Sequence, residues 1–178
     1  MENRIAKVMF SAAGGTASVG SKTCKLALPS SWLSRMGITE DNRCVELLFT
    51  GDEIRIRLRD TYDTFLQSKT AMGHEVYRLH YYNDRDLCTV ILADFTDQTL
   101  YTENRTDQLV KTAFGKKQLL LWEDFVSFLE ERCIPKGRAG LREYLEAIGL
   151  DEYDPWEIVK KTQGRMAEDQ QWIEIEIL

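Results

Sequence analysis

The chain has 178 residues, of which 43% are hydrophobic and 29% are charged, and this is the composition of an ordinary globular protein. A chain of this length accommodates one large domain or two small ones. It has no run of about 18 apolar residues, which excludes a membrane-spanning helix, and residues 1–10 lack the basic and then apolar layout of a secretory signal. We therefore expect a cytoplasmic protein.

The net charge of −6 is divided unequally along the chain. Residues 1–59 carry nine Lys and Arg against six Asp and Glu, whereas residues 60–178 carry 14 against 23. Between Asn3 and Thr39 there is no acidic residue. A segment without carboxylates suits a surface that faces phosphate groups, although a short segment can also lack acids by chance. An acidic half is common where a region avoids DNA or engages a basic protein.

Short strands and one short helix are expected in residues 1–59. Pro29 suits the start of the helix, and Gly37 suits its end because glycine adopts the left-handed conformation. Thr50-Gly51-Asp52 separates two apolar alternations, which indicates a hairpin. The expected strands are Arg4–Phe10, Lys25–Leu28, Cys44–Phe49 and Glu53–Leu58.

The order of these elements in residues 22–57 resembles the swapped-hairpin DNA-binding domain of the AbrB/MazE/SpoVT superfamily. The matching features are a strand, Pro29, a short helix that ends in Met-Gly-Ile, an acidic turn, and two strands joined by a Gly-Asp turn. The resemblance implies a β-barrel-like domain formed by two interleaved chains, and therefore a homodimer whose ligand is double-stranded operator DNA. The alternative is an ordinary pair of strands with a connecting helix in a small α+β domain.

A Gly, Ser and Ala-rich loop is expected over residues 11–21, next to several basic residues. Small residues let backbone amides approach a phosphate closely, although the same composition is typical of a surface loop. Most contacts from this region are expected to reach phosphates, which position a protein on DNA without reading its bases. The candidate DNA-binding residues are Lys7, Ser21, Lys22, Thr23, Lys25 and Arg35.

Beyond Arg59 the pattern changes. Residues 60–75 are expected to form a linker that contains a short helix, and residues 76–178 a separate acidic α+β domain that binds a partner. Asp154 before Pro155 is typical of a helix start. The domain is expected to contain strands over 76–82, 87–95 and 99–103, then three helices over 119–132, 139–148 and 155–161, and a terminal strand over 171–178.

Two motifs of this half, RCIPKGR at residues 132–138 and EDQQWI at residues 168–173, resemble a small Firmicutes module. That module occurs in toxin–antitoxin-like operons and ahead of HipA-type kinase domains. Residues 1–178 contain no kinase glycine loop and no HRD-like or DFG-like motif, so the resemblance implies association with a toxin or kinase-like protein. Aromatic and arginine side chains often anchor such interfaces. The candidate partner-binding residues are Trp156, Trp172 and Arg138.

No combination of residues predicts an active site. His74 and His80 are the only histidines, and their spacing fits neither a helical nor a tight-turn metal site. Ser30 lacks the glycines of a nucleophile elbow, and the glycines of residues 13–15 are not followed by the GK[ST] of a phosphate-binding loop. We therefore expect no catalysis, no cofactor and no metal. The four cysteines form no CxxC pair and are expected to be reduced, most of them buried.

Three arginines in the second half, Arg132, Arg138 and Arg165, are consistent either with anion binding or with structural pairing to Glu168 and Asp169. Taken together, the residues predict a dimeric DNA-binding antitoxin or operon autoregulator whose acidic half binds a partner protein. The alternative is a protein–protein adaptor, or an inhibitor from a phage or mobile element, in which residues 1–59 serve only for dimerisation.

Overall fold

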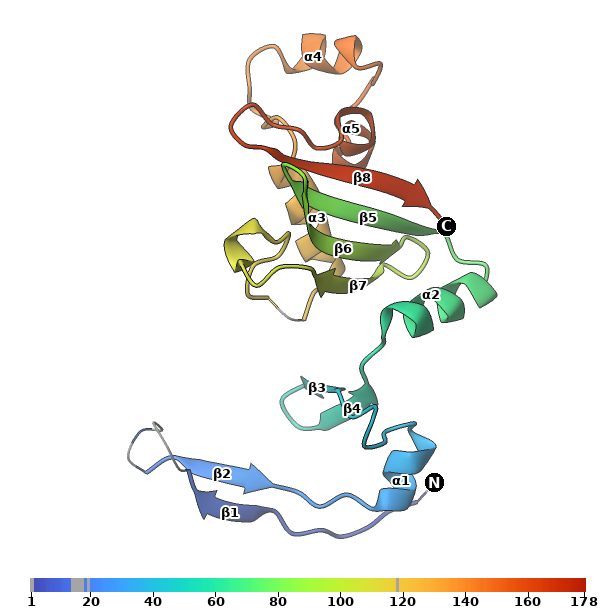
Figure 1. Cartoon of the computed structure of the whole chain (residues 1–178), viewed down its shortest axis with the longest axis vertical. Helices are drawn as coiled ribbons and strands as arrows, with labels where there is room; N and C mark the ends of the chain where they lie inside the picture. The colour runs from blue at the N-terminus through green and yellow to red at the C-terminus, as the bar shows by residue number, and fades with distance from the viewer. Residues whose placement is uncertain (1, 14–17, 19, 118) are drawn as a thin grey trace. The chain divides into compact units, whose positions relative to one another are not determined.

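The computed structural model describes residues 2–13, 18, 20–117 and 119–178. The chain forms two compact units, Met1–Arg59 and Asp60–Leu178 (Figure 1), and each is considered by itself. Helices and antiparallel sheets occur together, which confirms the predicted α+β class. Within the described ranges no sheet closes into a barrel, so the swapped-hairpin arrangement remains a prediction.

The first unit consists of two hairpins and one short helix. Thr50-Gly51-Asp52 joins the two strands of the second hairpin, as predicted, and Gly37 follows the helix with a φ of +73°. The elements are β1 (Met9–Ala12) paired with β2 (Lys22–Lys25), α1 (Ser30–Arg35), and β3 (Val45–Phe49) paired with β4 (Ile54–Leu58).

The first hairpin differs from the prediction. The strand expected over Arg4–Phe10 begins only at Met9, and the strand expected over Lys25–Leu28 ends at Lys25 instead of beginning there. Alternation identifies residues that are able to form a strand, but a strand also needs a partner, and the ladder ends at the pair Met9–Lys25.

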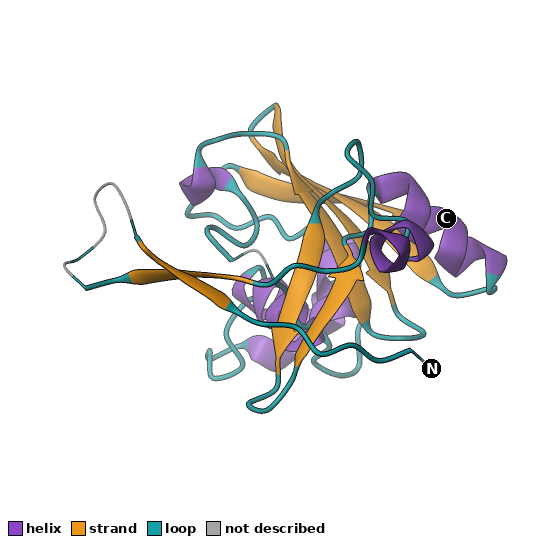
Figure 2. Ribbon diagram, turned by 90° about the horizontal axis from the view of Figure 1, so that it is seen from below, coloured by secondary structure: helices purple, strands orange, loops and turns teal. Residues whose placement is uncertain are grey.

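The second unit is built on one antiparallel sheet with the strand order β7-β6-β5-β8 (Figure 1). The strands are splayed relative to one another, as is usual in a sheet (Figure 2). The last strand of the chain therefore pairs with the first strand of the sheet, and β7 and β8 form the two edges. The strands are β5 (Val76–Asn83), β6 (Asp86–Asp94), β7 (Thr99–Asn104) and β8 (Gln171–Ile177).

Five helical segments accompany this sheet in the described part of residues 60–178, and the three predicted after β7 are all present. No helix of the described part of the chain is long and apolar enough to cross a membrane. The helical segments are α2 (Tyr62–Ala71), the 3₁₀ turn η1 (Leu109–Lys111), α3 (Trp122–Glu131), α4 (Leu141–Ala147) and α5 (Pro155–Thr162).

The main core lies between one face of the sheet and helices α3 and α5. Phe125 and Ile158 are completely buried there, because their positions on the two helices face the sheet. The β5 residues that reach this core are Tyr77, Leu79 and Tyr81, at the spacing of two that places side chains on one face. These packed elements hold β8 and α5 in a fixed geometry.

The opposite face of the sheet is covered at one end by α2. Phe65 is only 3% exposed and packs with Val76 and Leu92, which point away from the main core. Thr61 caps the helix by accepting from the N–H of Thr64. The helix in residues 60–75 therefore belongs to the second unit and is not the linker that the sequence predicted. Phe65 shields the apolar side chains of Val76 and Leu92 on this face from water.

Candidate dimerisation and nucleic-acid interface

The first unit has no buried residue in the part that the structure describes. Many of its large apolar side chains are exposed instead, with Phe49 at 69% and Phe10 at 66%. The second unit, by contrast, buries a full core. Burial of apolar surface is the main force that stabilises a fold. The hairpins of the first unit therefore lack the buried apolar core that a stable domain has.

The hairpin of β3 and β4 has one entirely apolar face. The pairs that face each other across it are Val45–Leu58, Leu47–Ile56 and Phe49–Ile54. Its other face is mixed, with an ion pair between Glu46 and Arg57 and with Leu48 opposite Arg55. We call the face formed by residues 45, 47, 49, 54, 56 and 58 the apolar hairpin face.

The predicted DNA-binding residues of β2 do not share one face. Lys22 and Lys25 are three positions apart, and neighbouring side chains of a strand alternate between its faces, so the two ammonium groups lie on opposite sides of the hairpin. Thr23 lies on the side of Lys25, opposite Ser11. Lys7 precedes β1 and is exposed.

Of the predicted loop over residues 11–21, positions 14–17 and 19 lie outside the described residues. Ser21, the last residue of that loop, accepts a hydrogen bond at its backbone oxygen from the N–H of Ala13 at 2.9 Å. Its hydroxyl donates to the hydroxyl of Ser18 at 3.3 Å. Ser21 therefore continues the hairpin beyond β2 and holds the base of the loop.

Arg35 is already paired within the unit. Its guanidinium donates two hydrogen bonds to the carboxylate of Glu2, at 2.7 and 3.0 Å, and the indole N–H of Trp32 donates a third at 2.6 Å. The bonds from Arg35 and then Trp32 lower the pKa of Glu2. Glu2, which lies just before the segment without acidic residues, therefore neutralises Arg35 of that segment. Lys7, Lys22 and Lys25 form no ion pair with any described residue.

The predicted partner-binding residues of the second unit have different environments. Trp156 packs in an aromatic cluster, 4.9 Å from Tyr77 and 4.6 Å from Phe95 between ring centroids. Trp172 stacks on Tyr82 at 4.4 Å and donates its indole N–H to the backbone oxygen of Asp84. Arg138 is exposed. Trp156 thus contributes to the core, Trp172 anchors β8 to the turn after β5, and Arg138 is accessible.

Arg132 is the centre of a polar network at the start of β8. Its side chain is 7% exposed, and it donates to the carboxylate of Asp169 at 2.6 and 2.9 Å and to the backbone oxygen of Gly164 at 2.9 Å. The bond from Arg132 lowers the pKa of Asp169. Of the two interpretations of Arg132, the structure therefore has the pairing with Asp169. Arg165 lies over the ring of Trp172, 4.7 Å from its centroid.

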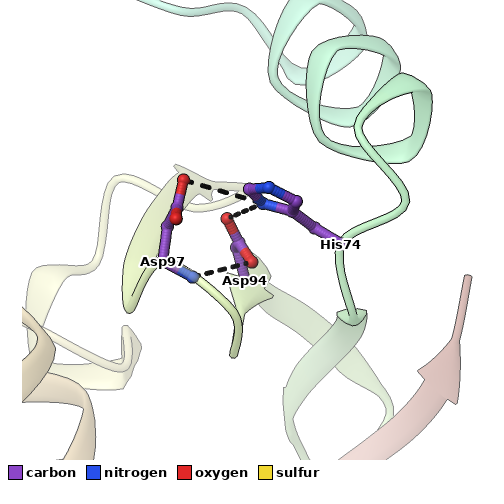
Figure 3. A group of neighbouring side chains, drawn as sticks. All are labelled: His74, Asp94 and Asp97. Atoms are coloured by element: carbon purple, nitrogen blue, oxygen red, sulfur yellow. Dashed lines mark hydrogen bonds and ion pairs between the residues drawn. The ribbon is translucent and has the colours of Figure 1, made fainter.

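A cluster that the sequence did not predict joins α2 to the sheet (Figure 3). The imidazole Nδ1 of His74 lies 2.9 Å from Asp94 Oδ2 and 3.6 Å from Asp97 Oδ2. By spacing alone this group suits a metal ion, since its ligand atoms lie within 4.8 Å of one another. Lys69 Nζ, however, lies 2.8 Å from Asp94 Oδ2 and 2.9 Å from Asp97 Oδ2. The ammonium group supplies the positive charge that both carboxylates need.

The ionisation of Asp94 follows from this cluster. Burial of the side chain, which is fully inaccessible, raises the pKa, but hydrogen bonds from Lys69, His74 and the backbone N–H groups of Asp97 and Thr96 outweigh it and lower the pKa to about 2. A carboxylate held ionised by this many donors is a structural hub. Its only sequence signals were a histidine directly after a helix and the Asp-x-x-Asp at the end of β6.

The apolar hairpin face and the unpaired lysines of the first unit are thus the features that internal structure does not explain. No known family model matches the chain, and no curated protein or solved structure is significantly similar to it. The exposed apolar surface and the charge of the first unit are therefore the features that bear on function.

Proposed function

We propose that the protein is a homodimeric DNA-binding antitoxin or transcriptional autoregulator of a toxin–antitoxin-like operon. In this proposal the first unit forms the dimer and contacts operator DNA, and the second unit binds a partner protein. The observation that carries it is the exposed apolar hairpin face in a unit whose described residues include none that is buried. The resemblance of residues 22–57 to the AbrB/MazE/SpoVT superfamily supports the same conclusion.

A second copy of the chain is the occupant that best fits the apolar hairpin face. A unit of this size is only marginally stable alone, and the described residues of this one include none that is buried. A twofold dimer brings the same patch from each chain into contact, so four exposed and two half-buried apolar positions per chain leave water together. At about 25 cal/mol per Å² of apolar surface, this burial is the main stabilising contribution open to the unit.

The charge of the first unit supports a DNA ligand. Lys7, Lys22 and Lys25 have no carboxylate partner among the described residues, so their charge is available to phosphates. A dimer doubles this positive charge, and binding to DNA then releases the counterions of each contacted phosphate. The acidic second unit carries 14 Lys and Arg against 23 Asp and Glu and is repelled by DNA, which leaves it free for a protein partner.

The dimer is tested by two neighbouring substitutions in the full chain. Leu47 lies on the apolar hairpin face and Leu48 lies on the mixed face, and their exposures are nearly equal at 58% and 52%. We expect Leu47→Glu to convert the dimer to monomer in sedimentation at micromolar concentration, because it places a charge in the buried centre. Leu48→Glu is the matched control and should remain dimeric. A monomeric wild type, or equal behaviour of the two variants, would overturn the proposed dimer.

DNA binding is tested on the same proteins with a labelled duplex in a salt titration. We expect wild type and Leu48→Glu to bind with affinity that falls steeply as salt rises, and Leu47→Glu to bind weakly. The adaptor alternative is favoured by one observation, the neutralisation of Arg35 by Glu2, which reduces the basic surface. A dimer that shows no salt-dependent DNA binding would establish the adaptor instead.

A further inference from the structure

The free edge of β8 carries backbone groups that point away from the sheet. The N–H of Leu178 donates to the oxygen of Val76, and the N–H of Asp84 donates to the oxygen of Gln170. These bonds set the alternation of the antiparallel pair, so the N–H and C=O groups of Ile173, Ile175 and Ile177 face outward.

Among these outward N–H groups, that of Ile173 has a hydrogen-bond acceptor. The N–H of Ile173 donates to the oxygen of Gln163, directly after α5, at 2.8 Å. The N–H groups of Ile175 and Ile177 have no hydrogen-bond acceptor in the described part of the chain. An unpaired edge of this kind is a template for another strand.

A groove runs beside this edge, between β8 and α5. Its lining includes Val159 and Lys160 from α5 and Ile175 and Ile177 from β8. Val159 is fully buried and forms apolar floor, while Ile177 is 64% exposed. On the other face of the strand the edge carries Glu174 and Glu176, which are both exposed. Glu176 is ion-paired with Arg78 of β5, and Glu174 lies 3.4 Å from the imidazole of His80, so an incoming cation would join these contacts at the solvent side. The edge is thus apolar toward α5 and acidic on its opposite face.

We infer that the edge of β8 binds an extended strand of a partner protein in which apolar and basic residues alternate. The inference rests on the proposed role of the second unit as the partner-binding part. The incoming backbone would pair with Ile175 and Ile177, its apolar side chains would enter the groove beside α5, and its Lys or Arg side chains would face Glu174 and Glu176. Backbone pairing supplies affinity, and the alternation supplies specificity.

Charge disfavours a second copy of the same edge in the registers that align the centres of the two strands. In an antiparallel pair of two β8 strands centred on Ile175, Glu174 of each copy faces Glu176 of the other. A pair centred on Glu174 or on Glu176 places that residue opposite its own equivalent. Like charges directly opposite each other destabilise a strand pair, so every such register is disfavoured. A basic strand turns the same two glutamates into favourable cross-strand partners.

The first test uses two blocked peptides of about six residues, the usual length of a strand. One alternates Val with Lys and the other alternates Val with Glu. We expect the Val–Lys peptide to shift and protect the backbone amides of Ile175 and Ile177 in NMR spectra of the full chain, with affinity at least about tenfold above that of the Val–Glu peptide. Equal affinities, or no change at these amides with either peptide, would overturn the inference.

The second test changes the edge itself. Ile177→Pro removes one outward N–H at an exposed position, whereas Ile177→Ala removes the same side chain and keeps the N–H. We expect Ile177→Pro to weaken the Val–Lys peptide about tenfold relative to Ile177→Ala. Equal affinities of the two variants would contradict strand pairing.

Dimerisation and DNA binding of Ile177→Pro are measured in parallel. We expect both to match wild type, because the proposed dimer and DNA contacts lie in the first unit. A dimer lost in Ile177→Pro alone would assign the edge to a second copy and overturn the inference. If wild type binds DNA but not the Val–Lys peptide, the strand-binding inference is wrong and the proposed DNA role stands. If wild type binds the peptide but not DNA, the proposed DNA role is wrong and the strand-binding inference stands.

Discussion

Asp94 is the residue through which α2 is tied to the sheet. Its carboxylate accepts from Lys69 on α2 and from His74 directly after that helix, and it is completely buried. The donors hold its pKa at about 2, below the ordinary value of 3.8. Because the folded pKa is lowered, the ionised carboxylate stabilises the fold at pH values above about 4, and this contribution is lost as the pH falls through about 2.

We expect Asp94→Asn to lower the free energy of unfolding by about 2 kcal/mol at pH 7, since the substitution removes the charge that these donors stabilise. Urea titrations followed by tryptophan fluorescence measure the change. At pH 2 the difference from wild type should be smaller, because Asp94 itself is then about half protonated. Asp97→Asn is the control: Asp97 also accepts from Lys69, but it is 51% exposed and should matter less. Equal effects of the two variants would contradict the assignment of Asp94 as the hub.

Arg132 provides a second prediction at this scale. Arg132→Met removes the guanidinium partner of the Asp169 carboxylate, which then keeps only the backbone N–H of Gln171, and the donor to the oxygen of Gly164. We expect a loss of about 3 kcal/mol in the free energy of unfolding, since removing one member of a buried pair strands the other. Arg138→Ala removes an exposed guanidinium of the same segment and should change the stability by less than about 0.5 kcal/mol. Thermal or urea unfolding of both variants measures this contrast.

At the scale of elements, the β1–β2 hairpin presents its lysines on both faces. If the hairpin lies in a groove of the duplex, Lys22 and Lys25 both approach phosphates in spite of this division. We expect the double variant Lys22→Ala, Lys25→Ala to lower the slope of log K against log salt by about 0.9 for each lost contact, for specific and random DNA alike.

Arg35→Ala is the matched control for the lysine variants, because Glu2 already neutralises that guanidinium. We expect this variant to keep nearly the wild-type slope and affinity, measured by anisotropy on the same labelled duplexes. A larger effect from Arg35 than from the two lysines would place the DNA face on α1 instead of the hairpin.

The sequence predicted the elements of the second unit well because their signals are local. The Asp154-Pro155 start of α5 and the alternation in Gln171–Ile177 each lie within a few residues. What it did not predict were partners distant in sequence, such as the pairing of β8 with β5 and the packing of Phe65 on Val76 and Leu92. Local patterns identify which residues form a strand or helix, but not which surface each covers.

The candidate interface was predicted in part for the same reason. The spacing of two in Val45, Leu47 and Phe49 and again in Ile54, Ile56 and Leu58 identified the apolar hairpin face directly. The pairing of Arg35 with Glu2, 33 positions away, had no local signal, and neither had the contact of His74 with Asp94, 20 positions away. The placement of Lys22 and Lys25 on opposite faces follows from strand alternation. The sequence did not predict it because it placed the strand at Lys25–Leu28 and not at Lys22–Lys25.

At the scale of the whole molecule, the boundary between the units lies between Arg59 and Asp60. A fragment of residues 60–178 retains Phe65 over the sheet, whereas a fragment of residues 76–178 exposes Val76 and Leu92. We expect the longer fragment to unfold cooperatively and to be more stable by about 3 kcal/mol or more, the usual contribution of a buried Phe. Calorimetry of the two purified fragments measures the difference. Equal stability would show that α2 contributes little to the second unit.

The pairing of β8 with β5 also affects how the protein is made. Tyr77 lies opposite Ile177 in the sheet, so β5 keeps an open edge during synthesis until residues 171–177 have left the ribosome. The first unit has no such long-range strand pair among its described residues, and chains generally fold from their N-terminal domains first. If the first units dimerise as proposed, two nascent chains on one messenger RNA join through them while both second units are unfinished. In that interval the open edge of β5, rather than that of β8, is the surface most exposed to wrong pairing.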